Sequence, residues 1–457
     1  MKNSRRDFIK TSALSLVGTA AFANKPFYIS KLGEKSAADI IQIATIGIGI
    51  QGHYDTNSAL KNEGIKLVAA ADLYTGRLER AKQVFGQDIF TSRDYRELLS
   101  RSDVDAVIIA TADHWHDTIT KEALLAGKHV YCEKPMVQDI SEGKSVIEHW
   151  RKSGKTMQVG SQRVSGSDFQ KARELIAAGE IGEINFIEAT YDRFSSIGAW
   201  NYSIPLDAST ETVDWDTFLK DTAKMPFDAN RFFRWRNYKE YGTGVAGDLF
   251  VHLVTGVHFA TQSQGPERIY STGGLRYWTE GRNVPDVMVG VLDYPKSDKH
   301  AAFQLVMRVN FANSGTINNT TRIVGSEGQI EFIRGGLKLS KRKLPKAPGM
   351  GGYDSLFTFT EDQQKAYEAE YNQRYSEEDK KAVPLFEKEF LNPKGEDEHK
   401  NHFANFFENV RKGSQETVED PVFAFRAAAP VLACNKSYFD KKTVHWDPIE
   451  MKIKKGK

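Results

Sequence analysis

Residues 47–52, Gly-Ile-Gly-Ile-Gln-Gly, decide the fold of this chain. They follow the apolar run Ile40–Ile46, whose length and β-branched residues indicate a strand. Their G-x-G-x-x-G spacing is typical of a turn that joins a strand to a helix and binds a dinucleotide. In such a turn Gly47 allows the tight bend, and Gly49 lets a pyrophosphate approach the backbone at the helix N-terminus. Gly52 lets helix and strand pack closely.

An acidic residue follows the next predicted strand. That strand is Lys66–Ala71, and Asp72 comes about 20 residues after Gly52, the spacing of a ribose-binding acid. A carboxylate there accepts hydrogen bonds from ribose hydroxyls and repels a 2′-phosphate, so the sequence predicts NAD rather than NADP. Arg77 is the one feature that favours a phosphate, and we expect it on the exposed face of a helix.

Apolar runs of strand length alternate with helical segments from residue 40 to about residue 163. Further strands are expected at Asp88–Phe90, Asp105–Thr111, His129–Cys132 and Thr156–Val159, and helices at Gly76–Phe85, Tyr95–Leu99, Asp117–Leu125 and Gly143–Trp150. This alternation is typical of a parallel sheet covered on both faces. The sequence therefore predicts an α/β Rossmann domain over residues 38–163, with a doubly wound parallel sheet of six strands.

Length and composition limit the remaining possibilities. A chain of 457 residues is longer than one hydrophobic core usually covers, so a second domain is expected over residues 164–457. The 62 basic and 60 acidic side chains nearly balance, which gives no electrostatic reason to expect nucleic acid as partner. Cys132 and Cys434 are expected to be separate buried thiols, and no Cys/His spacing indicates a metal site.

The chain begins with a charged segment that contains two consecutive arginines, Arg5 and Arg6. An apolar stretch, Thr11–Ala23, follows and ends in an A-x-A-like cleavage site. The stretch is shorter than the about 20 residues of a membrane span, and no other stretch is apolar enough to insert stably in a membrane. Because the pattern resembles twin-arginine signals, residues 1–23 are predicted to be a signal peptide, and the mature chain is predicted to be periplasmic.

Further motifs lie at the ends of later strands and in the second half. They are the His114–His116 segment, Ala126-Gly127-Lys128-His129-Val130, Glu133-Lys134-Pro135 and the Asp-x-x-x-His element Asp248–His252. With residues 47–52, they make the chain resemble the Gfo/Idh/MocA family of sugar oxidoreductases. The resemblance covers nearly all of the mature chain and is weakest in a charged insertion at about residues 341–398.

The resemblance implies an α+β C-terminal domain with an open, mainly antiparallel sheet, through which the chain would form a homo-oligomer. The sequence agrees, since several segments are rich in β-branched and aromatic residues. These are Ile184–Tyr191, Arg268–Tyr277, Asp286–Tyr294, His300–Phe311, Thr320–Val324 and Gln329–Ile333. Helices are expected at Asp168–Ala178, His402–Arg411 and Phe423–Tyr438.

The resemblance also implies the site residues. Those expected to contact NAD are Gly47, Gly49, Ile50, Gln51, Gly52, Asp72, Thr111, His114, His116, Glu133 and Gln162. For Glu133 a structural role is an equal alternative. Those expected to bind substrate are Lys134, Arg163, Arg236, Tyr238 and His252.

Catalysis is expected from Lys134, Asp248 and His252. Asp248 and His252 are four residues apart, so on a helix they share a face and the carboxylate can orient the imidazole. His252 is the predicted base because its ordinary pKa lies near neutrality. Lys134 would hydrogen-bond the reacting oxygen. A buried, hydrogen-bonded helix histidine is the alternative for His252.

Three functions fit these motifs. The first is oxidation of a hydroxyl of a sugar or sugar derivative by hydride transfer to NAD. The second is glycoside cleavage that uses tightly bound NAD for a transient oxidation followed by elimination. The third is a non-enzymatic sugar-binding protein. The presence of Lys134, Asp248 and His252 together argues against the third.

Overall fold

The computed structural model describes residues 40–317 and 319–454, so the expected signal peptide lies outside the described residues. Residues 41–160 contain a six-stranded parallel sheet in the order β3-β2-β1-β4-β5-β6, which confirms the predicted Rossmann fold. Its strands are β1 (Ile41–Ile46), β2 (Ile65–Ala71), β3 (Phe90–Ser92), β4 (Ala106–Ile109), β5 (His129–Glu133) and β6 (Met157–Gly160). The helices between them are α2 (Ile50–Leu60), α3 (Thr75–Phe85), α4 (Tyr95–Ser100), α5 (His116–Leu125) and α6 (Gly143–Ser153).

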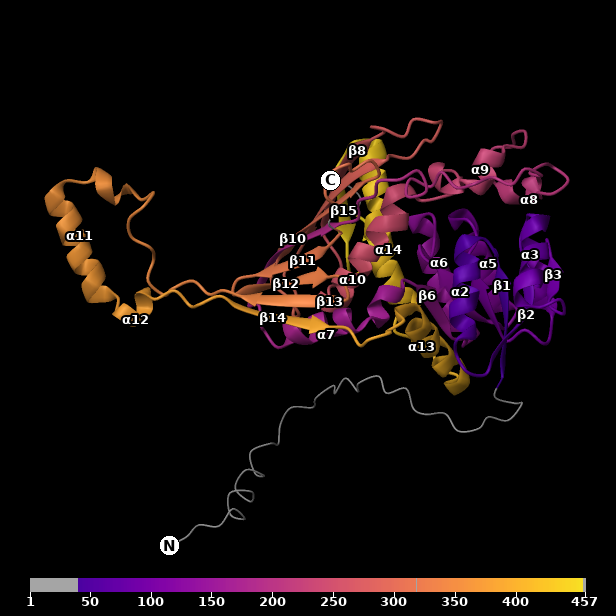
Figure 1. Cartoon of the computed structure of the whole chain (residues 1–457), viewed down its shortest axis with the longest axis horizontal. Helices are drawn as coiled ribbons and strands as arrows, with labels where there is room; N and C mark the ends of the chain where they lie inside the picture. Colours follow the sequence, from indigo (N-terminus) through magenta and orange to yellow (C-terminus); the bar gives the residue numbers. More distant parts are fainter. Residues whose placement is uncertain (1–39, 318, 455–457) are drawn as a thin grey trace, which may run out of the picture. The chain divides into compact units, whose positions relative to one another are not determined.

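The central strands of this sheet are buried on both faces. Every residue of β4 is buried, as a parallel sheet with helices on both sides requires. Part of one covering layer comes from the far end of the chain, where α13 (Glu398–Lys412) packs against α2 and β6 (Figure 1). Its Phe403, Phe406 and Phe407 join the apolar cluster of Ile41 and Ile43.

The second half is built on a ten-stranded sheet in the order β14-β13-β12-β11-β7-β10-β9-β8-β15-β16. Its strands are β7 (Ile184–Thr190), β8 (Arg268–Gly274), β9 (Val287–Tyr294), β10 (Phe303–Asn310), β11 (Thr321–Gly325), β12 (Gly328–Ile333), β13 (Gly336–Lys341), β14 (Phe386–Leu391), β15 (Val444–Asp447) and β16 (Lys452–Ile453). Only β7 and β10 pair in parallel, so the mainly antiparallel sheet is confirmed.

Helices cover one face of the large sheet. They are α7 (Ser167–Ala177), α10 (Val251–Thr261) and α14 (Pro421–Asp440). Buried residues alternate along β9 and β10, so these strands turn one face to the core. The helix α14 packs on β8 and α10 and also on α6 of the Rossmann domain, which joins the two halves (Figure 1). Among the described residues no helix is long and apolar enough to cross a membrane. Cys132 and Cys434 are buried and unpaired, as predicted.

The charged segment expected as an insertion at about residues 341–398 contains a strand of the large sheet. That strand is β14, which pairs with β13 along its whole length. Its charged residues fit an edge strand, where charge opposes pairing with other chains. Between β13 and β14 lie α11 (Glu361–Arg374) and α12 (Glu377–Lys380), in which no residue is buried (Figure 1).

The contact between α6 and α14 gives a stability prediction. A Cβ on Gly143, the first residue of α6, would collide with the ring of Phe425, whose side chain is fully buried on α14. Gly143→Ala should therefore lower the free energy of unfolding by about 1–3 kcal/mol. Gly349→Ala is the matched control, since no atom lies within 4 Å of the added Cβ. Chemical denaturation of both variants measures the difference, and equal stabilities would contradict this packing.

Candidate active site

The turn after β1 has the backbone that its glycines predict. Gly47 has a φ of +85°, and a Cβ on it would lie 2.7 Å from the carbonyl oxygen of Ala110. A Cβ on Gly52 would collide with the carbonyl oxygen of Gly47. Gly49 is the N-cap of α2, where the first backbone N–H groups of the helix have no partner within the helix. The turn therefore fits a pyrophosphate bound at the helix N-terminus.

A cavity lies beside this turn. Several residues predicted to contact NAD line it: Gly47, Gly49, Ile50, Gln51, Asp72 and Thr111. Asp72 follows β2 and is 7% exposed, and its Oδ1 accepts a hydrogen bond of 3.0 Å from the Tyr74 backbone. The cavity, the helix N-terminus and this carboxylate together fit NAD, with Asp72 placed to bind the adenosine ribose.

Contrary to the prediction, Arg77 does not lie on an exposed helix face. Its guanidinium lines the cavity, with Nη1 3.4 Å from each carboxylate oxygen of Asp72. Its guanidinium carbon lies 5.4 Å from the ring centre of Phe233. A carboxylate and an aromatic face together hold a cation, which explains why the side chain turns inward.

A segment of the second half, residues 207–236, covers this cavity and is called the covering segment below. Backbone hydrogen bonds attach it to the Rossmann domain, from Thr75 to Thr212 at 3.0 Å and from Asp214 to Leu73 at 2.9 Å. It carries α8 (Trp215–Leu219) and α9 (Ala229–Phe233) (Figure 1). The residues that it adds to the lining are Thr217, Phe218, Phe232, Phe233, Trp235 and Arg236. A nucleotide in the cavity would be enclosed by both halves of the chain.

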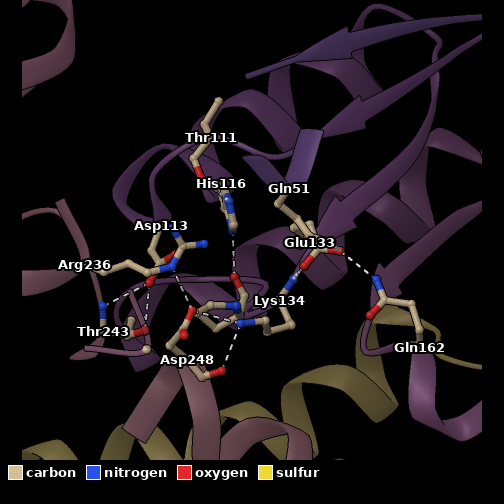
Figure 2. A network of polar contacts seen from close by, with 12 residues as sticks. Gln51, Thr111, Asp113, His116, Glu133, Lys134, Gln162, Arg236, Thr243 and Asp248 are labelled. Atoms are coloured by element: carbon tan, nitrogen blue, oxygen red, sulfur yellow. Dashed lines mark hydrogen bonds and ion pairs between the residues drawn. The ribbon is translucent and has the colours of Figure 1, made fainter. Parts of the chain in front are cut away.

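Lys134 and Asp248 meet where the two halves join (Figure 2). Lys134 follows β5, and its Nζ lies 2.9 Å from Oδ1 and 2.9 Å from the backbone carbonyl of Asp248. Arg236 donates from Nε to the same carboxylate oxygen at 3.1 Å. Burial alone would raise the pKa of Asp248, but the charges of Lys134 and Arg236 outweigh it and hold that pKa well below its usual range. Asp248 is therefore an ionised partner of two cations.

Among the described residues, Asp248 makes no hydrogen bond to His252. Asp248 lies in a π-helical turn (Ala246–Phe250), whereas His252 is the second residue of the regular helix α10. The wider turn changes the angular offset between them, and Asp248 bonds to Lys134 and Arg236 instead. Burial lowers the pKa of His252 well below 6.5, and the nearby charge of Lys134 lowers it further. The imidazole is thus neutral near pH 7.

A missed residue, Asp113, positions the π-helical turn (Figure 2). Its Oδ2 accepts hydrogen bonds from the backbone N–H of Thr243 at 2.9 Å and from its hydroxyl at 2.7 Å. The side chain of Thr243 lies against Gly247, so close that a Cβ on Gly247 would collide with it. Asp113 thus links the end of β4 to the turn that carries Asp248. In the sequence, Asp113 lies between two segments predicted to belong to the site, and this position could have identified it.

The structure does not place His114 and His116 against the cavity. His114 lies within hydrogen-bond distance of the carbonyl oxygens of Phe218 (2.8 Å) and Tyr241 (3.2 Å). His116 likewise faces the carbonyl oxygen of Pro135 at 2.8 Å. Both rings are buried, so these histidines hold loops together. Neither histidine belongs to the cavity lining, where a contact with NAD was predicted.

Glu133 ends β5 and Gln162 follows β6, and neither belongs to the cavity lining. Figure 2 shows their side chains turned toward each other. Gln162 donates from Nε2 to Glu133 Oε1 at 2.7 Å and to the Tyr131 hydroxyl at 2.9 Å. Burial raises the pKa of Glu133 to about 7, although Lys134 acts in the opposite direction. This geometry corresponds to the structural alternative for Glu133. Within the part of the chain that the structure describes, no cluster of His, Cys, Asp and Glu could hold a metal ion.

Among the predicted substrate residues, Tyr238 lies apart from the cavity. It is 7% exposed and belongs to an apolar cluster with Tyr241 and Phe233. Arg163 lies after β6, and its guanidinium carbon is 5.2 Å from the ring centre of Tyr191. Tyr202, which the sequence did not single out, lines the cavity beside Arg236.

Curated relatives match part of the chain. A glycosyl hydrolase family 109 protein from Shewanella sp. (strain ANA-3) is 30% identical over 207 residues, which cover 41% of this chain and 45% of that protein. An inositol 2-dehydrogenase from Salmonella typhimurium is 30% identical over 160 residues, which cover 34% of this chain and 47% of that protein. The matches thus span less than half the length of these relatives.

Solved structures share the fold over most of the chain. A levoglucosan dehydrogenase in complex with NADH and levoglucosan superposes with a TM-score of 0.61, at 17% identity, and covers 89% of this chain and 99% of that one. An oxidoreductase from Thermotoga maritima gives a TM-score of 0.63 at 19% identity, and covers 90% of this chain and 100% of that one.

Family profiles match both halves. The profile described as "Oxidoreductase family, NAD-binding Rossmann fold" matches residues 41–161. The profile described as "GFO/IDH/MocA C-terminal domain" matches residues 219–331. The first match contains the glycine-rich turn, Asp72 and Lys134, and the second contains Arg236, Asp248 and His252. The chain therefore belongs to the Gfo/Idh/MocA family of oxidoreductases and has that family's NAD-binding Rossmann domain.

Proposed function

We propose that the protein oxidises a hydroxyl group of a sugar or sugar derivative with NAD. The observation that carries this proposal is the Lys134–Asp248 ion pair at the end of β5, close to His252. Arg236 connects this cluster to the nucleotide cavity, because it lines the cavity and also bonds to Asp248. A binding protein without chemistry would not need a lysine, a carboxylate and a histidine held together at low exposure.

The residues divide the chemistry between them. NAD, when bound, accepts hydride from the carbon that carries the reacting hydroxyl. Lys134 is placed to donate a hydrogen bond to the reacting oxygen, and Asp248 keeps its ammonium group in position. His252 is neutral near pH 7 and can therefore accept the hydroxyl proton. Asp248 also balances part of the positive charge around the site.

Substitution of the two reacting side chains should separate chemistry from nucleotide binding. His252→Ala should lower single-turnover reduction of NAD by roughly 10²–10⁴-fold, and Lys134→Ala should also abolish most turnover. Bound NAD should remain, since the turn at residues 47–52 and Asp72 hold it. Because burial depresses the pKa of His252, the acidic limb of the rate profile should lie below pH 6.5. The exposed His445→Ala is the control.

The assay is reduction of NAD in stopped flow with a panel of sugars and inositols. If His252→Ala reduces NAD at the wild-type rate, His252 takes no part in the mechanism. Its role is then the structural one of a buried, hydrogen-bonded helix histidine.

Cofactor preference should depend on the contact between Asp72 and Arg77. Asp72→Ser should weaken the binding of NAD about 10–100-fold, because a hydrogen bond to a charged group is lost. It should strengthen NADP, because Arg77 stays in the cavity without its carboxylate. Fluorescence titration of both nucleotides measures the effect. In the double variant Asp72→Ser/Arg77→Met the gain for NADP should disappear, and an unchanged NADP affinity in the single variant would contradict the assignment.

A second candidate is glycoside cleavage through a transient oxidation with resident NAD. The covering segment supports it, because it closes the cavity with residues of the second half and is bonded to Leu73 and Thr75. Such enclosure favours a nucleotide that stays bound through many turnovers. Product analysis with aryl glycosides separates the two candidates, since only the second releases the aglycone.

We also propose export by the twin-arginine route, supported by Arg5, Arg6 and the run Thr11–Ala23. Wild-type protein recovered from the periplasm should hold about one NAD per chain, because the covering segment encloses it. The double variant Arg5→Lys/Arg6→Lys should stay in the cytoplasm as precursor, whereas Lys10→Arg should not change export. Cell fractionation and mass spectrometry of released nucleotide measure both. Equal periplasmic recovery would refute the route, and nucleotide-free mature protein would refute enclosure.

A further inference from the structure

The loop after β7, residues 193–202, is held in place by two arginines. Nη1 of Arg193 donates a hydrogen bond of 2.9 Å to the carbonyl oxygen of Gly198. Nη2 of Arg282, a buried side chain from the loop between β8 and β9, donates one of 2.7 Å to the carbonyl oxygen of Ala199. Both bonds run from a charged donor to the main chain, so the path of the backbone is fixed.

The next residue of this loop has a strained backbone. Trp200 has a φ of +64°, in the left-handed region that residues with a large side chain rarely adopt. It is 1% exposed, and its indole ring packs edge-to-face on Phe311, with ring centres 4.8 Å apart. Such conformations persist only where the surrounding packing enforces them, and they are common where proteins hold a ligand. The bend at Trp200 sets the direction of the chain that reaches Tyr202.

Tyr202 lies at the wall of the nucleotide cavity, which Arg236 also lines. Its carbonyl oxygen accepts a hydrogen bond of 2.7 Å from Nε of Arg234, two residues before Arg236. Arg236 in turn donates to Asp248, the partner of Lys134 (Figure 2). These contacts place Tyr202 at the end of the cavity that adjoins the ion pair of Lys134 and Asp248.

The hydroxyl of Tyr202 has no hydrogen-bond partner in the part of the chain that the structure describes. The other tyrosine of the cavity lining, Tyr95, differs, because its hydroxyl donates to Glu122 at 2.8 Å. Burial raises the pKa of Tyr202 above its ordinary value, with Asp248 acting in the same direction and Arg236 against it. The phenol is therefore neutral at neutral pH and can both donate and accept a hydrogen bond.

A neutral hydroxyl complements the charged groups beside it. Lys134 and Arg236 only donate hydrogen bonds, and the ionised Asp248 only accepts them. A sugar hydroxyl does both, and the Tyr202 hydroxyl can match it in either role. The aromatic ring also offers an apolar face to the C–H groups of a sugar.

We propose that Tyr202 binds the substrate and helps to determine which sugars react, through a hydrogen bond from its side chain to a sugar hydroxyl other than the reacting one. The inference rests on the proposed oxidation of a sugar hydroxyl and adds a specificity-determining residue to it. A site that hydrogen-bonds a substrate hydroxyl discriminates against analogues that lack it, because its own polar group then stays unpaired. The ribose of NAD carries hydroxyls of the same chemistry, and the test distinguishes the two.

The test compares Tyr202→Phe with the wild type in steady-state reduction of NAD. The probes are glucose, galactose and myo-inositol. For the most reactive of them, Tyr202→Phe should raise KM about tenfold, the effect of one lost hydrogen bond, and should leave the affinity for NAD unchanged. Tyr270→Phe, which removes the hydroxyl of an exposed tyrosine on β8, is the matched control and should keep the wild-type KM.

Monodeoxy analogues of the most reactive sugar identify the hydroxyl that Tyr202 binds. One analogue should lose about tenfold in kcat/KM with the wild type, because the phenol is left without its partner. With Tyr202→Phe the same analogue and the parent sugar should have similar kcat/KM values, since each change removes the same interaction.

Equal KM values for Tyr202→Phe and the wild type would overturn the inference. A loss confined to the affinity for NAD would assign Tyr202 to the nucleotide ribose and also overturn it. Failure of the proposed function looks different. In that case calorimetry on the NAD-loaded protein shows sugar binding that weakens in Tyr202→Phe, but no sugar forms NADH. Absence of both binding and NADH formation with all three sugars would overturn the inference and the function together.

Discussion

The ion pair between Lys134 and Asp248 connects the Rossmann domain to the second half at the point where the reaction would take place. Both side chains are about nine-tenths buried, with 10% and 9% exposed, and the ammonium also bonds to the backbone carbonyl of Asp248. Loss of one partner of a buried pair typically costs about 3–5 kcal/mol, because the other charge is left without compensation. Here Arg236 already shares the carboxylate, so removal of Asp248 would leave two cations unpaired. The geometry of the site and the position of the domains therefore depend on the same contact.

This contact is itself held from both sides. Asp113 binds Thr243 and so fixes the approach to the π-helical turn, while His114 contacts carbonyl oxygens of the second half. These residues follow β4 and lie beside the strand that ends at Glu133. The strand ends of the parallel sheet thus position two kinds of group: those that line the cavity and those that hold the second half against it.

The Rossmann domain could be predicted because its signals are local. A strand, the turn at residues 47–52 and Asp72 at the end of the next strand lie within about 30 residues, the length of one βαβ unit. The mainly antiparallel sheet followed from β-branched segments and from the family resemblance. In contrast, β14 was not predicted, because an exposed edge strand is rich in charged residues and its composition is therefore like that of an insertion.

The contacts within the site could not be predicted to the same extent. The inward turn of Arg77 depends on Phe233, which lies far along the chain. Asp248 bonds to Lys134 and Arg236 from a wider helical turn, whereas spacing alone assumes a regular helix.

The placement of α13 has a consequence for the order of events during synthesis. The strands β1 and β2 leave the ribosome long before α13, yet Phe403, Phe406 and Phe407 complete the apolar cluster that contains Ile41 and Ile43. Until these phenylalanines emerge, one face of the nucleotide-binding sheet exposes apolar surface to water. The N-terminal domain therefore cannot finish folding as an independent unit while the chain grows. Its completion requires that the chain has been made as far as α13.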